Sequence, residues 1–385
     1  DAWADHKRLH EVVCDFPLEW SPGSKVHYHG LTAHWTLGVL IEGAFTNVLK
    51  RSQDFSHSDW GKVDATITAD ATMSPDGTVN ADLVTEGTAG TAAVAQTGTA
   101  TTASAAVCGS IFVKPSANIT WLRVILGDST AATGVSTWVN LSTGALGTVS
   151  VLGSATSTGA QVVAAGNGFW KIELWATFQS GVSNVILNIR SAAADNSNTR
   201  VNNAAYYLWQ ADAGLGARPS SPVVTTSAAV IRAADDIQLL TARFPFDATK
   251  GTLYHRARPG QMAAGITYVA TELYQTTGSE IALYHTTAKF FLARVGGVTQ
   301  ASLQGGAPAS SIPYGACGSW KDNDFAASFD GDTILTDTSG TLPAPTTLAL
   351  GSLGGLNSHL NGHLRRVAYW ARDFSDAENV VKAAA

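Results

Sequence analysis

The stretch from Gly87 to Val113 contains no charged residue and is built mainly from Ala, Thr, Gly and Val. Because β-branched residues favour strands, this composition predicts strands buried in a sheet and excludes a solvated linker. Turn signals recur through the same half of the chain, at Pro75-Asp76-Gly77, Gly127-Asp128, Ser142-Thr143-Gly144 and Gly166-Asn167-Gly168. Short strands separated in this way predict an all-β fold of the antiparallel β-sandwich or jelly-roll type.

Two segments, 121–126 and 170–175, alternate with the period of a strand that has one buried face. The predicted inward residues are Leu122, Val124 and Leu126 in the first segment and Trp170, Ile172 and Leu174 in the second. The same alternation leaves Trp121, Arg123 and Trp175 on outer faces.

Composition excludes several classes of protein. The 385 residues include 24 Lys and Arg against 30 Asp and Glu, and the net charge of −6 disfavours nucleic-acid binding. Only 14% of residues are charged, which argues against a coiled coil, and no apolar run is long enough to span a membrane. The three cysteines are too few and too far apart for a disulfide framework and are expected to be small buried residues.

The length predicts two domains after a short N-terminal segment. Residues 1–43 are rich in His and Trp, and 31–42 are predicted to form a short helix. Residues 44–227 form the first predicted sandwich and 228–385 the second, with the Pro- and Ser-containing segment 217–227 as the connector.

The first predicted sandwich resembles a module of bacteriophage structural proteins. The resemblance rests on ordered phrases at 42–47, 52–60, 74–78, 166–169, 207–209 and 225–235. The resemblance implies a carbohydrate-binding-type jelly roll, as found on tail fibres and other virion appendages.

The second predicted sandwich is similar to concanavalin-A-like and laminin-G-like domains. The similarity rests on Trp320–Gly331, which it implies is a strand pair, and on Leu360–Trp370, which it implies is the last long strand. Ser375 followed by Glu378 predicts a capping box at the start of a short C-terminal helix.

Residues 1–42 resemble a fragment of serine β-lactamase-like esterases. In that family a tyrosine at the position of Tyr28 serves in the general-base role. The S-x-x-K motif of that family is absent from the chain. We therefore expect no hydrolase activity of this type.

Sugar binding needs flat aromatic rings beside planar polar groups. The candidate glycan-binding residues are Trp121, Arg123, Trp138 and Trp175. The alternative for each tryptophan is packing beneath a loop or against another subunit.

Four carboxylates within eleven positions are candidate ligands for a structural Ca²⁺, the one cofactor considered. They are Asp322, Asp324, Asp330 and Asp332. The sequence Asp330-Gly331-Asp332 equally predicts a hairpin turn, and two of these groups could form a glycosidase pair. A lyase would instead need a base such as His285 or Tyr284 with Arg294, although no spacing singles these out.

Taken with the resemblances, these features predict a phage virion appendage protein that attaches to polysaccharide on a bacterial surface. The low charge favours a neutral or mixed polysaccharide. The fibre-like resemblance implies a homo-oligomer, a trimer in particular, that contacts other virion proteins, is made in the host cytoplasm and is displayed on the particle. We expect neither enzyme activity nor membrane insertion. The alternatives are a polysaccharide depolymerase and a structural spacer without glycan binding.

Overall fold

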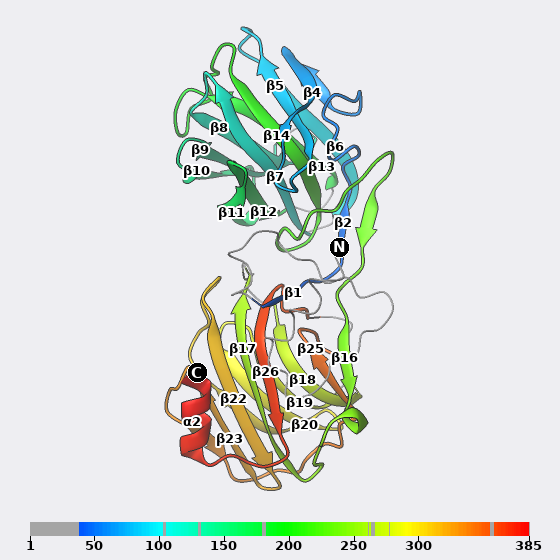
Figure 1. Ribbon diagram of the computed structural model, residues 1–385, viewed down its shortest axis with the longest axis vertical. Coiled ribbons are helices and arrows are strands. Elements are labelled where there is room, and N and C mark those ends of the chain that lie inside the picture. Colours follow the sequence, from blue (N-terminus) through cyan, green and yellow to red (C-terminus); the bar gives the residue numbers. More distant parts are fainter. Residues whose placement is uncertain are drawn as a thin grey trace. The chain divides into compact units, whose positions relative to one another are not determined.

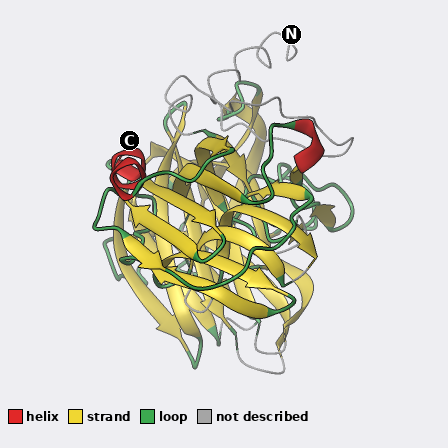
Figure 2. Ribbon diagram, turned by 90° about the horizontal axis from the view of Figure 1, so that it is seen from below, coloured by secondary structure: helices red, strands yellow, loops and turns green. Residues whose placement is uncertain are grey.

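The computed structural model describes residues 38–102, 105–129, 132–178, 182–260, 262, 266–276, 278–354 and 358–384. The chain forms two compact units (Figure 1). The N-terminal sandwich is Phe45–Arg232, and the C-terminal sandwich combines the described residues up to Ala44 with those from Ala233 onward. Strands make up nearly all the regular structure, as Figure 2 shows, so the predicted all-β class is confirmed.

The N-terminal sandwich contains two six-stranded antiparallel sheets. The β8 sheet consists, in spatial order, of β10 (Ala145–Leu152), β9 (Gly134–Asn140), β8 (Trp121–Gly127), β13 (Val182–Ala192), β6 (Ala93–Thr102) and β3 (Gly61–Val63). The β7 sheet consists of β11 (Thr156–Gly166), β12 (Phe169–Thr177), β7 (Ala106–Ala117), β14 (Ala205–Leu215), β5 (Val79–Glu86) and β4 (Ala65–Met73). A two-stranded sheet joins β2 (Phe45–Asn47) to β15 (Val230–Arg232).

The core of the N-terminal sandwich lies between these two sheets. Leu122, Val124 and Leu126 of β8 are fully buried in the same cluster as Ile111 of β7 and Ile172 of β12. The predicted inward faces are therefore confirmed. Each such side chain contributes about 1.5–3 kcal/mol to stability by leaving water.

The C-terminal sandwich also has two six-stranded sheets. The β17 sheet runs β1 (Val39–Ile41), β26 (Gly362–Trp370), β17 (Lys250–Pro259), β22 (Tyr314–Lys321), β23 (Asp324–Phe329) and β24 (Leu335–Asp337). The β18 sheet runs β16 (Ile237–Leu240), β25 (Thr347–Leu350), β18 (Tyr268–Thr276), β19 (Ser279–His285), β20 (Lys289–Val295) and β21 (Val298–Gln304). A 3-10 turn, η3 (Thr241–Arg243), follows β16.

The helix predicted over residues 31–42 is wrong in its described part. Val39–Ile41 is a strand that pairs antiparallel with β26, and Ile41 is buried in the core of the C-terminal sandwich. The sequence of this apolar run does not show that it is a strand, because its strand partner lies more than 300 positions away. Residues 1–37, which hold Tyr28 and most of the His- and Trp-rich segment, lie outside the described residues.

The predicted C-terminal helix and strand pair are present. β22 and β23 form a hairpin, and β26 is the last strand. Helix α2 (Asp376–Ala384) begins with a complete capping box. Ser375 accepts a hydrogen bond from the Glu378 backbone N–H at 3.4 Å, and the Glu378 carboxylate accepts one from the Ser375 N–H at 2.9 Å.

The two described cysteines, Cys108 and Cys317, are free and buried, as predicted. Burial raises the pKa of the Cys317 thiol to about 12. Across the described ranges, no helix is long and apolar enough to cross a membrane.

Candidate functional site

The outer side of the β8 sheet, opposite its buried face, carries polar and aromatic side chains. Alternation along β8 directs Trp121 and Arg123 outward. The strand register then places Trp138 of β9 on one side of Arg123 and Arg190 of β13 on the other. We call this surface the arginine face and define it by Trp121, Arg123, Trp138, Asn188 and Arg190.

Arg123 is held firmly in this face. Its guanidinium lies 4.6 Å from the centre of the Trp138 ring, which places it in cation–π contact. It also donates hydrogen bonds to the Ser136 hydroxyl at 3.2 Å and to the Asn198 side-chain oxygen. Arg123 is only 8% exposed, yet its Nε has no hydrogen-bond partner among the described residues.

Trp138 does not offer an open ring, contrary to its predicted role as a sugar platform. It is 2% exposed, and its indole N–H donates to the Ser197 carbonyl at 2.7 Å. Its ring supports Arg123 from below. The alternative interpretation, packing beneath a loop, is correct for this residue, and the loop is the one that follows β13.

Arg190 extends the positive charge of the face. It is partly exposed, and its Nε is buried without a partner, as is the Asn188 side-chain oxygen. Among the described residues, neither Arg190 nor Arg123 forms an ion pair with a carboxylate. Burial and the charge of Arg190 lower the pKa of Arg123 to about 10, and burial and Arg200 lower the pKa of Arg190.

The charge of the Glu86 carboxylate raises the pKa of Arg190 and so opposes part of its lowering. Both oxygens of Glu86, however, already accept hydrogen bonds from other groups. One oxygen accepts from the Ser191 N–H at 2.8 Å and from the Tyr206 hydroxyl at 2.9 Å. The other accepts from the Ser191 hydroxyl at 2.6 Å and pairs with Arg200 at 3.4 Å. Glu86 therefore pairs directly with Arg200 and forms no ion pair with Arg123 or Arg190, although its charge is felt at Arg190.

Trp121 supplies the accessible aromatic group of the arginine face. It is partly exposed at the start of β8, and its ring lies close to Gly147, where an added Cβ would come within 2.8 Å. The Asp195 carboxylate binds β10 next to Gly147 by accepting from the backbone N–H and the hydroxyl of Thr148. Trp121 thus has a defined position beside the two arginines.

Trp175 lies elsewhere, on the outer side of the β7 sheet. It packs with Phe45, Cys108 and Val223, and the Arg218 guanidinium covers its ring at 4.3 Å. It is 9% exposed. The structure therefore brings together three of the four predicted glycan-binding residues and separates Trp175 from them under a covering segment.

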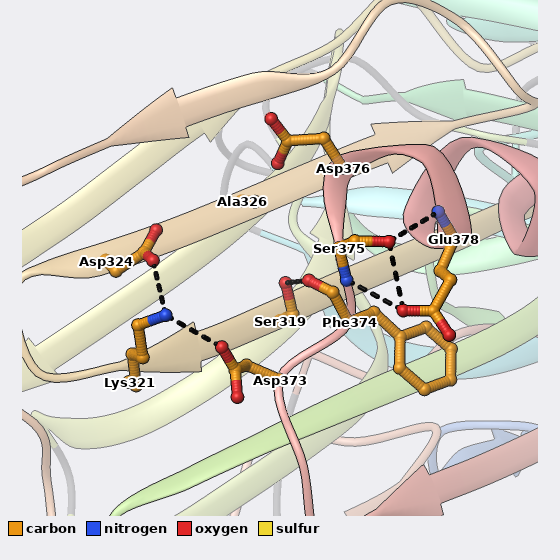
Figure 3. Close-up of a pocket in the computed structure, with 9 residues that line it drawn as sticks. All are labelled: Ser319, Lys321, Asp324, Ala326, Asp373, Phe374, Ser375, Asp376 and Glu378. Atoms are coloured by element: carbon orange, nitrogen blue, oxygen red, sulfur yellow. Dashed lines mark hydrogen bonds and ion pairs between the residues drawn. The ribbon is translucent and has the colours of Figure 1, made fainter.

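The four candidate calcium ligands are dispersed. Asp324 and Asp373 both bind the Lys321 ammonium at 2.9 Å, so a lysine occupies the place a cation would take. These groups line a pocket beside the start of helix α2 (Figure 3), and its volume is about 390 Å³. Asp322 lies in the β22–β23 hairpin turn, next to Asn323, which has a positive φ of 56°.

Asp330 and Asp332 form the predicted turn at the end of β23. Asp330 and Gly331 both have positive φ, and the Asp332 N–H donates to the Phe329 carbonyl at 2.9 Å. The Asp330 carboxylate pairs with Lys289 and accepts from the Gly315 N–H. Within the described part of the chain, no three His, Cys, Asp or Glu side chains are grouped to hold a metal ion, so the calcium prediction is not supported.

The residues considered for a lyase point in opposite directions. His285 is fully buried in the C-terminal sandwich and shares a hydrogen bond of 2.9 Å with the Tyr314 hydroxyl. Burial and the charge of Lys289 lower its pKa to about 4. Tyr284 and Arg294 lie on the other face of the same sheet, so these three groups cannot act on one substrate.

The sequence analysis did not predict two residues of the arginine face. Asn188 and Arg190 belong to the segment Asn184–Arg190, in which Val185, Leu187 and Ile189 alternate with polar or partly exposed residues. That period-2 signal was available. The pairing of β13 with β8, which sets Arg190 opposite Arg123, was not readable from the sequence.

No protein-family model matches the chain, and a search of curated proteins gives no match. Among solved structures, CBM40 of the Ruminococcus gnavus IT-sialidase, bound to alpha2,3 sialyllactose, is 14% identical and covers 38% of this chain and 92% of its own, with a TM-score of 0.33. The mouse laminin alpha1 chain, domains LG4-5, is 8% identical and covers 93% and 96%, with a TM-score of 0.26.

The CBM22-1-CBM22-2 tandem domain from Paenibacillus barcinonensis Xyn10C is 11% identical and covers 84% of this chain and 97% of its own, with a TM-score of 0.27. The neighbours are thus carbohydrate-binding modules and laminin G domains. TM-scores and identities in this range carry no argument about what this chain binds. These three matches include no phage protein and no esterase, so both resemblances stay predictions.

Proposed function

We propose that the chain is a glycan-binding protein that attaches to bacterial surface polysaccharide through the arginine face of its N-terminal sandwich. The observation that carries this proposal is the juxtaposition of a partly exposed Trp121 with Arg123, Asn188 and Arg190, which have polar atoms that no described residue satisfies. A pyranose ring can stack its C–H groups on an indole while its hydroxyls meet planar polar groups.

The arrangement supports binding more than catalysis. The cluster offers hydrogen-bond donors and an amide oxygen, and the two carboxylates described next to it are both engaged, Glu86 by four donors and Asp195 by the N–H and hydroxyl of Thr148. We therefore propose an adhesin and not an enzyme. Display in several copies, as in a trimeric appendage of a phage virion, would multiply weak individual contacts.

Affinity electrophoresis in gels cast with bacterial capsule or lipopolysaccharide tests the proposal. We expect retardation of the protein by a subset of polysaccharides without any shortening of the polymer. Trp121→Ala should weaken retardation at least tenfold, whereas Trp370→Ala, a change of the same type in the C-terminal sandwich, should leave it intact.

Two outcomes would contradict the proposal. Shortened polysaccharide after incubation would identify a depolymerase. No retardation across a broad panel would leave the structural spacer as the function of the chain.

A further inference from the structure

The arginine face holds more positive charge than the surrounding residues neutralise. Burial and the charge of Arg190 lower the pKa of Arg123, burial and the charge of Arg200 lower the pKa of Arg190, and Glu86 forms its ion pair with Arg200. This local excess of positive charge contrasts with the net charge of the whole chain, which is −6. The excess therefore calls for an explanation specific to the arginine face.

The surplus is also partly removed from water. Arg123 is 8% exposed, and the Nε atoms of both Arg123 and Arg190 are buried without hydrogen-bond partners. Burying a guanidinium without a partner is unfavourable, and arginine cannot relieve the cost by losing its proton. An external anion that binds the other N–H groups of both side chains would compensate their charge.

The geometry favours such an anion because the site is already organised. Arg123 is fixed between the Trp138 ring, Ser136 and Asn198, so little side-chain freedom is lost when a ligand binds. Arg190 is the register partner of Arg123 on the neighbouring strand. Two planar guanidinium groups carried by register partners can each donate to one oxygen of a carboxylate that lies between them.

We propose that the arginine face recognises an acidic sugar, such as a hexuronate, through its carboxylate. This inference rests on the proposed glycan binding and adds the substrate class. The carboxylate accepts hydrogen bonds from Arg123 and Arg190, and the ring stacks on Trp121. Since the chain as a whole is acidic, the best ligand is a polysaccharide whose acidic residues are spaced by neutral ones.

A matched pair of ligands tests the carboxylate directly. An acidic bacterial polysaccharide containing hexuronate is compared with the same polymer after chemical reduction of its carboxyl groups to primary alcohols. We expect the full-length protein to bind the native polymer at least tenfold more tightly than the reduced one, with affinity falling as salt rises.

Arg190→Gln is the matching change in the protein. We expect it to weaken binding to the native polymer at least tenfold, to weaken binding to the reduced polymer much less, and to preserve the melting temperature. Arg243→Gln, which removes one charge from an exposed position of the C-terminal sandwich, controls for net charge. A merely structural role of Arg190 would instead lower the melting temperature and affect both polymers alike.

Equal binding of the native and reduced polymers would overturn the acidic-sugar inference and leave the proposed glycan binding in place. Binding that survives reduction because the polymer carries phosphate would also overturn it, in favour of a phosphate ligand. Failure to bind any polysaccharide would instead overturn the proposed function.

Discussion

The two sandwiches both hold basic side chains away from water, but they satisfy them differently. In the C-terminal sandwich, His255 and His285 lie in the core and are neutral, because burial lowers their pKa values to about 3 and about 4. In the N-terminal sandwich, Arg123 and Arg190 lie on an outer face and keep their charge. A histidine can adapt to a dry environment by losing a proton, whereas an arginine needs a partner, and this difference is why we propose the outer face as the binding surface.

The largest expected effect is acid destabilisation of the C-terminal sandwich. The folded-state pKa values of His255 and His285 are below the ordinary value, so their contribution is complete above pH 6.5 and is lost as pH falls toward 4 and 3. Each histidine removes about 1.4 kcal/mol of stability per pH unit in that window. Glu272, whose pKa burial raises to about 7, acts in the opposite direction between pH 4.5 and 7.

The net loss is therefore about 1.4 kcal/mol per pH unit from pH 6.5 to 4.5, and about twice as steep below. Hydrogen exchange followed by mass spectrometry at pH values from 7 to 4, corrected for intrinsic exchange rates, locates the effect. Protection should fall in β17 and β19 well before it falls in β8 and β13. A simultaneous loss in both sandwiches would break the contrast between them.

The next effect comes from Glu272, which is 2% exposed and accepts a hydrogen bond of 2.6 Å from the Gly354 N–H. Its raised pKa means that stability is lost as pH rises from 4.5 through 7. We expect Glu272→Gln, which retains the accepting oxygen, to raise the free energy of unfolding by about 1–3 kcal/mol at pH 8. Urea denaturation at pH 8 and pH 5 measures it, and equal effects at both values would contradict the prediction.

A smaller effect is expected at the cap of helix α2. Ser375→Ala removes the hydroxyl that accepts from the first turn and should cost about 1 kcal/mol. The same urea transition monitors this change. No loss would mean that contacts of α2 with β22 and β23 hold the helix without its cap.

The smallest change in stability is expected on the arginine face. Because the Nε of Arg190 is buried without a partner, Arg190→Gln should change the free energy of unfolding by less than about 1 kcal/mol, with any change being a gain. Thermal melting measures it. A loss of several kcal/mol would show that Arg190 is a structural group, as the histidines of the other sandwich are.

Local alternation predicted a good part of the N-terminal sandwich. Leu122, Val124 and Leu126 are buried as expected, because a strand's two faces are fixed by a period of two. The same rule placed Trp121 and Arg123 outward. It could not say which outward side chains stay accessible, since that depends on segments distant in sequence.

Two such segments determine which of the predicted binding residues are covered. Ser197 and Asn198 cover Trp138 and engage Arg123, while Arg218 closes over Trp175. The register between β8 and β13 could not be predicted from the sequence either. Trp121 and Leu187 lie on these paired strands but are 66 positions apart. The strand at Val39–Ile41 shows the same limit, since its partner β26 is at the far end of the chain.

Protection of the arginine face on binding is the most direct test of the account. Hydrogen exchange of the full-length protein is measured with and without an oligosaccharide derived from a polysaccharide that retards it in gels. The account predicts added protection in peptides covering Trp121–Gly127 and Asn184–Arg190, and none in the C-terminal sandwich. Protection confined to the C-terminal sandwich, or to the covered surface around Trp175, would contradict it.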